Sequence, residues 1–70
     1  MAPECHEEAE ILLERLRNYV EAVDNLWTTT HECEFHETRC EALARLEEDM
    51  GDAYERLRDA LHSLVRCLTK

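Results

Sequence analysis

The chain has 70 residues, with 17 acidic against 8 basic side chains and a net charge of −9. A chain this short rarely builds a core worth more than about 3–5 kcal/mol unaided, so it needs a disulfide, a metal or a partner. One glycine and one proline are too few turn residues for a many-stranded sheet, which leaves an all-α protein. Because an acidic chain repels phosphate groups, we expect neither nucleic acid nor an anionic membrane as a partner.

The first predicted helix covers about residues 4–30. Its apolar residues recur at alternating spacings of three and four, which is a heptad pattern: Ala9, Leu12, Leu16, Tyr19, Val23 and Leu26. A second apolar row, formed by Leu13, Val20 and Trp27, runs beside the first. The two rows together cover roughly 140° of the helix surface, more than a two-stranded coiled coil buries. We therefore expect this helix to contact at least two others.

Three consecutive β-branched residues, Thr28–Thr30, favour a helix end. Two capping boxes then compete to start the second helix. Thr29 with Glu32 would start it near residue 30, whereas Thr38 with Glu41 would start it near residue 39. We place the second helix at about residues 39–69, so the whole chain forms a single domain, residues 1–70.

The apolar row of the second helix continues in phase through the only glycine, Gly51. Its members are Leu43, Leu46, Met50, Ala53 or Tyr54, Leu57, Leu61, Leu64 and Leu68. A glycine inside a helix costs only about 1 kcal/mol, so we favour one unbroken helix and an antiparallel helical hairpin. The alternative is a monomeric three-helix bundle, broken at Thr28–Thr30 and at Gly51.

The four cysteines are placed almost symmetrically along the chain. In a hairpin folded near residue 36, Cys5 lies opposite Cys67 and Cys33 lies opposite Cys40. A three-helix bundle would instead bring Cys33 near Cys67. Free cysteines that pack as small apolar side chains are the alternative to disulfides at all four positions.

A cluster of metal-ligand types occupies the predicted turn: His31, Cys33, His36 and Cys40. Zinc takes four nitrogen or sulfur ligands in a tetrahedron, and a loop here could wrap one ion. If the segment is helical, Cys33 and Cys40 lie about 10.5 Å apart along the axis, too far for a shared ion. The alternative interpretation is an acidic turn between two helices that binds no metal.

The sequence shows no clear motif for catalysis. Cys40 and His36 are within helical reach of each other, but nothing specifies an oxyanion hole or a shaped pocket. We therefore expect a non-catalytic protein. An N-terminal apolar segment typical of a signal peptide is not visible, which favours an intracellular protein, with a processed secreted fragment as the alternative.

The apolar rows are too wide for one hairpin to bury, so we expect two hairpins to dimerise into a four-helix bundle. The predicted interaction face consists of Leu12, Leu16, Tyr19, Val23, Leu57, Leu61 and Leu64. The sequence thus predicts an oligomerisation or protein-interaction module whose partner is a second copy or another amphipathic helix. A zinc-stabilised helical domain and a secreted, disulfide-clamped helical factor are the alternatives.

Overall fold

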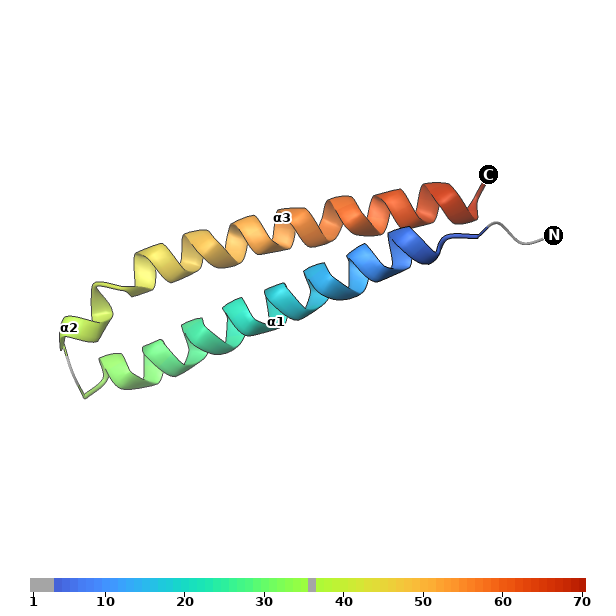
Figure 1. Ribbon diagram of the computed structural model, residues 1–70. Coiled ribbons are helices and arrows are strands. Elements are labelled where there is room, and N and C mark those ends of the chain that lie inside the picture. Colours follow the sequence, from blue (N-terminus) through green and yellow to red (C-terminus); the bar gives the residue numbers. More distant parts are fainter. Residues whose placement is uncertain (1–3, 36) are drawn as a thin grey trace.

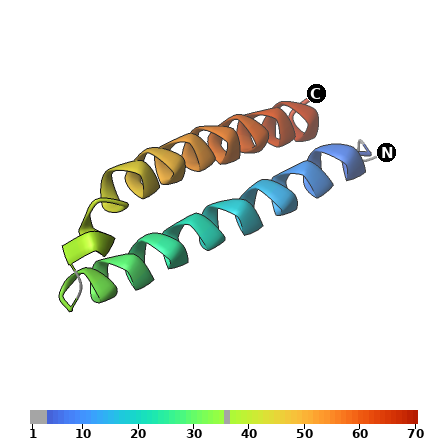
Figure 2. The ribbon, with the colours of Figure 1, turned by 60° about the vertical axis from the view of Figure 1, so that its left-hand side comes forward.

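The computed structural model describes residues 4–35 and 37–70, and the chain forms an antiparallel helical hairpin (Figure 1). Helix α1 (His6–Cys33) and helix α3 (Leu43–Leu68) run side by side, and the single turn α2 (Glu37–Cys40) lies between them at one end. The first residues of α1 and the last residues of α3 lie at the opposite end, as Figure 2 also shows. The described residues contain no strand, so the predicted all-α class is confirmed.

Helix α1 does not end at the three threonines. It continues through Thr28–Thr30 to Cys33, three residues beyond the predicted end. The Thr30 hydroxyl donates a hydrogen bond to the carbonyl oxygen of Leu26, at 2.8 Å. This bond to the preceding turn satisfies the hydroxyl inside the helix, so the β-branched run does not force a helix end. The stop expected at Thr28–Thr30 is therefore wrong.

The turn is built without either predicted capping box. Helix α3 begins at Leu43 after Ala42, whose side chain makes no cap, so it starts four residues later than the sequence predicts. Residues 37–40 instead form the separate turn α2. Arg39 in this turn pairs with Glu32 of α1, with Nε and Oε2 3.5 Å apart, although both side chains are largely exposed. Such an exposed pair adds little stability.

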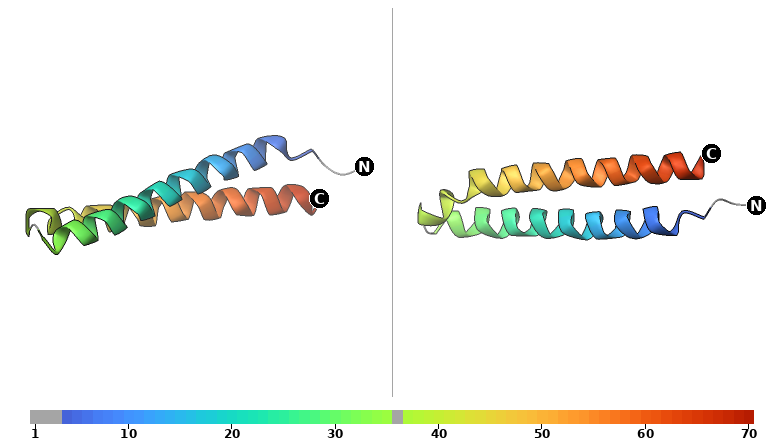
Figure 3. Two further views of the ribbon diagram at one scale, coloured as in Figure 1. Left: turned by 90° about the horizontal axis from the view of Figure 1, so that it is seen from below. Right: turned by 45° about the horizontal axis from the view of Figure 1, so that its top comes forward.

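Helix α3 passes through Gly51 without a break. A Cβ atom at this position would meet nothing within 4 Å, so the glycine serves no close approach. With both predicted breaks absent, the three-helix bundle is wrong and the hairpin is the observed fold. Figure 3 shows the same two-helix arrangement from two further directions.

A single seam joins the two long helices. We define the seam as the more buried row of each helix, in which spacings of three and four alternate. On the α1 side it comprises Cys5, Glu8, Leu12, Arg15, Tyr19, Ala22, Leu26, Thr29 and Cys33. On α3 it comprises Leu43, Leu46, Met50, Ala53, Leu57, Ala60, Leu64 and Cys67. Tyr19 meets Tyr54 beside the seam, with ring centroids 6.0 Å apart.

The seam makes a very small core. Among the described residues, only Cys5 and Ala60 are buried. The molecule measures 57 × 14 × 12 Å, and its radius of gyration is 16.2 Å, against about 11 Å for a compact domain of this length. The hairpin is therefore a rod with most of its apolar side chains at least partly in contact with solvent.

Candidate interaction surface

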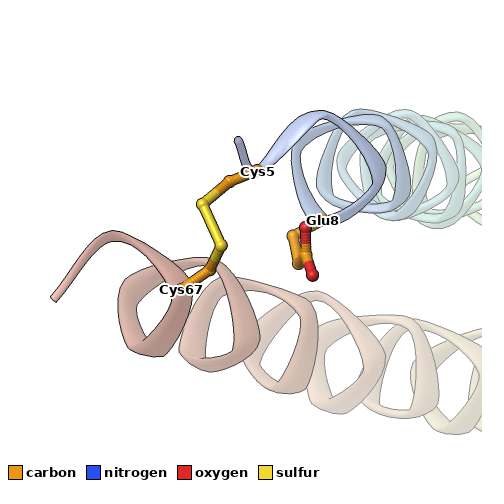
Figure 4. A group of neighbouring side chains, drawn as sticks. All are labelled: Cys5, Glu8 and Cys67. Carbon is orange, nitrogen blue, oxygen red and sulfur yellow. A yellow bond between two sulfur atoms is a disulfide. The ribbon is translucent and has the colours of Figure 1, made fainter. Parts of the chain in front are cut away.

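Disulfides close both ends of the hairpin. Cys5, at the N-terminal boundary of α1, is bonded to Cys67 in the last turns of α3, and their Cα atoms are 6.1 Å apart (Figure 4). Cys33, the last residue of α1, is bonded to Cys40 of α2, with Cα atoms 4.8 Å apart. These are the two pairs that the hairpin predicted, and no described cysteine is free. The bonds fix the antiparallel register of α1 and α3.

The surface beside the seam differs sharply between its two sides. In an antiparallel pair of right-handed helices, residues that directly follow a seam residue lie on the same side of both helices. Residues that directly precede a seam residue lie on the other side. We name these two surfaces the apolar flank and the polar flank.

The apolar flank carries most of the exposed large apolar side chains. Those of α1 are Leu13, Leu16, Val20 and Trp27, and those of α3 are Tyr54, Leu61, Val65 and Leu68. Trp27 and Leu13 are each 65% exposed. Glu47 and Arg58 are the charged residues that follow a seam residue within α3. The apolar side chains extend over residues 13–27 of α1 and residues 54–68 of α3, and so many exposed on one side are unusual for the surface of a monomer.

The polar flank is hollowed and charged. Two shallow hollows of about 240 and 250 Å³ lie along it, and both are lined by Arg15 and Arg56. The remaining lining residues are Ile11, Asn18, Asp49, Asp52, Ala53, Asp59, Ala60 and Ser63. Every lining residue belongs to the seam or directly precedes a seam residue, in agreement with the assignment of the flanks. Three aspartates beside two arginines make this a solvated polar surface.

The predicted interaction face divides between the seam and the apolar flank. Leu12, Tyr19, Leu57 and Leu64 lie in the seam, where they are partly buried between α1 and α3. Val23, which follows the seam residue Ala22, is also partly buried. Leu16 and Leu61 lie on the apolar flank and are 43% and 46% exposed. These last two residues remain available to a partner.

The residues proposed as zinc ligands lie around the turn. Cys33 and Cys40 are joined to each other, so in this oxidised form neither sulfur is a thiolate ligand. His31 is exposed, and its ring lies edge-on to Trp27 with centroids 4.3 Å apart. His36 lies outside the described residues. Zinc binding by this cluster stays a prediction for the reduced chain.

Sequence reasoning missed two charged members of the seam, Glu8 and Arg15. The apolar pattern assigned Ala9 and Leu16 to the contact row, one position later in each case. Both Ala9 and Leu16 follow seam residues in the structure. A signal was present, because Cys5 and Cys33 are four heptads apart. Counting heptads from Cys5 gives Cys5 itself, Leu12, Tyr19, Leu26 and Cys33, and the residue three positions after each of the first four completes the observed α1 row, Glu8 and Arg15 included.

Comparison of the chain with protein-family models, with curated proteins and with solved structures finds no match. No described helix carries an apolar stretch long enough to cross a membrane.

Proposed function

We propose that the chain is a non-catalytic oligomerisation module, in which the apolar flanks of two hairpins pack together to form a four-helix bundle. The observation that carries the proposal is the apolar flank itself: eight large apolar side chains on one side of a hairpin whose other side is charged. Burying such a surface is the dominant favourable contribution to protein association. A second hairpin presents a surface of the same length and chemistry.

The accessible area supports this proposal. The chain exposes 5878 Å², whereas a folded monomer of this mass is expected to expose about 4,600 Å². The excess of about 1,300 Å² is comparable to the roughly 800 Å² that each partner buries in a standard interface. A second copy on the apolar flank would bring the exposed area per chain to that of an ordinary small domain.

The distribution of charge favours one arrangement of the two copies. Residues 4–14 contain five glutamates and no basic residue, whereas residues 56–70 contain four basic side chains and one acidic side chain. A two-fold axis parallel to the helices would place α1 against α3 of the second copy, with the same ends together. Acidic and basic segments then meet across the interface as they do within each hairpin, and complementary potentials fix such a register.

The two disulfides bear on where the module works. Structural disulfides form and persist in oxidising compartments and are rare where thiol reductants are abundant. They support the secreted, disulfide-clamped factor over the intracellular protein that the sequence favoured. A secreted module and a self-associating module are compatible, because the disulfides lie at the ends and the apolar flank extends between them.

Trp27 provides a direct test, because it is the only tryptophan and lies on the apolar flank. In a dilution series of the oxidised chain, we expect its fluorescence emission to move to longer wavelength and its quenching by acrylamide to increase as the dimer dissociates. The variant Leu16→Glu, which places a charge on the same flank, should show the solvent-exposed spectrum at every concentration. A wild-type spectrum that does not change on dilution and matches that of Leu16→Glu would reject the proposal.

A further inference from the structure

Three side chains that can bind a metal lie together where the start of α1 meets the end of α3. We call this the open end of the hairpin, because no turn of the chain connects the helices there. The ligand atoms of Cys5, Glu8 and Cys67 all lie within 4.8 Å of one another. Figure 4 shows the Glu8 carboxylate beside the Cys5–Cys67 bond, in the space between α1 and α3. Cys5 and Glu8 are three residues apart and so share one face of the first turn, while Cys67 comes from the opposite helix.

Glu8 is a half-buried carboxylate at the contact between the two long helices. It belongs to the seam, in which Arg15, Ala22 and Thr29 occupy the equivalent heptad positions of α1. Among the described residues, the one ion pair joins Arg39 to Glu32, so Glu8 has no basic partner there. Partial burial of a carboxylate costs free energy unless a partner compensates it. Among the described residues, the two cysteine sulfurs lie beside this carboxylate.

We propose that, when the Cys5–Cys67 disulfide is reduced, Cys5, Glu8 and Cys67 bind one zinc ion, with a water molecule as the fourth ligand. The proposal does not depend on self-association. Two thiolates select a thiophilic cation such as Zn²⁺ over Ca²⁺ or Mg²⁺, which prefer oxygen ligands alone. Zinc bonds of about 2.0–2.3 Å place ligand atoms roughly 3.3–3.8 Å apart, so small side-chain rotations within the present cluster suffice.

The disulfide is converted into the zinc site in two steps. A dithiol reductant transfers two electrons and two protons to the Cys5–Cys67 bond and becomes a disulfide itself, leaving two thiols. Zn²⁺ then binds both sulfurs as thiolates, and the two protons pass to solvent. The same two helices are thus joined by a covalent bond in oxidising conditions and by a metal in reducing conditions. The start of α1 and the end of α3 would stay joined under both conditions.

The test uses the full chain carrying Cys33→Ser and Cys40→Ser, so that only the open-end cysteines remain. After reduction with a phosphine, Co²⁺ is added as a coloured probe and Zn²⁺ as its competitor. We expect one equivalent of Co²⁺ with thiolate-to-cobalt charge-transfer absorption, which Zn²⁺ abolishes. Zinc should also protect both cysteines from alkylation, and circular dichroism should show helix retained or regained in its presence.

Glu8→Gln separates coordination from general electrostatics. It should weaken zinc binding about tenfold or more, because the substitution removes a carboxylate that contributes to the metal site. Glu10→Gln removes the same charge from an exposed position on the same helix and should leave the affinity unchanged. Absence of one-to-one binding, or of helix stabilisation by zinc, would overturn the proposal. Equal weakening by Glu8→Gln and Glu10→Gln would overturn the assignment of Glu8 as a ligand.

Discussion

The two flanks of the hairpin share one backbone geometry but differ in chemistry. Residues that precede a seam position include four charged residues around the two hollows: Asp49, Asp52, Arg56 and Asp59. Residues that follow a seam position include Leu13, Leu16 and Trp27, which are all exposed. Since the seam itself buries almost nothing completely, the apolar flank holds much of the apolar surface that the fold leaves unburied. The difference supports the proposed packing of two hairpins through their apolar flanks.

The flanks exist only while α1 and α3 keep their register, so the largest predicted effects come from the disulfides. Replacing Cys5 and Cys67 by serine should lower the free energy of unfolding by about 4 kcal/mol. Replacing Cys33 and Cys40 by serine should lower it by about 2 kcal/mol. The reason is that the first bond joins residues 62 apart and the second joins residues 7 apart, and chain-entropy stabilisation grows with loop length.

This prediction is measured by denaturant unfolding followed by circular dichroism. Both double variants should be made in the Leu16→Glu background, so that association does not contribute to the measured stability. A larger loss from the Cys33–Cys40 pair than from the Cys5–Cys67 pair would contradict the loop-length argument.

The second prediction compares the flanks directly. Leu16→Glu should weaken self-association by about 100-fold or more while leaving the monomer folded, because the charge is buried only in the dimer. Asn18→Glu places the same charge two residues away on the polar flank and should change the dissociation constant by less than about threefold. Light scattering over a concentration series gives both constants. Equal effects would show that the flanks do not differ in role.

A third, smaller effect concerns salt. Each chain carries a net charge of −9, so two copies repel each other at long range. Raising the ionic strength from 0.1 to 1 M shortens the screening length from about 10 to about 3 Å, and the dimer should tighten several-fold. In the proposed dimer the few basic groups near the end of α3 would set the orientation of the two copies, but they would not offset the net repulsion. Weaker association at high salt would indicate an interface built from ion pairs instead of the apolar flank.

The smallest predicted effect lies at Gly51, which follows the seam residue Met50. Gly51→Ala should raise the free energy of unfolding by about 0.5–1 kcal/mol, because alanine is the better helix former and its Cβ atom meets nothing within 4 Å. Thermal unfolding of the oxidised chain measures the gain. A loss of stability accompanied by weaker association would show that a partner packs closely against this position.

The hairpin and its disulfide pairs could be predicted because long-range symmetry in the sequence specifies them. Cys5 and Cys67 are as far from the turn as each other, and the apolar row of α3 keeps its phase through Gly51. The end of α1 could not be predicted from propensity alone. Thr30 lies inside the helix with its hydroxyl bonded to the carbonyl oxygen of Leu26, an arrangement that helices accommodate although threonine intrinsically prefers helix ends.

The composition of the interaction surface was harder to derive. An apolar pattern marks every position that avoids water, whether the partner is α3 or a second molecule. Leu12 and Leu16 therefore looked equivalent, although the first lies in the seam and the second is exposed. Glu8 was missed because a charged residue at a seam position contradicts the pattern. It becomes interpretable only when Cys5 and Cys67 are seen beside it.

Sedimentation equilibrium of the oxidised chain measures whether two hairpins associate. We predict a reversible equilibrium between a species of 8.3 kDa and one of twice that mass, with the heavier species dominant at high concentration. The Leu16→Glu variant should sediment at 8.3 kDa throughout, with the circular dichroism of a folded helical protein. A folded wild-type chain of 8.3 kDa at every concentration would contradict the claim that the apolar flank joins two hairpins.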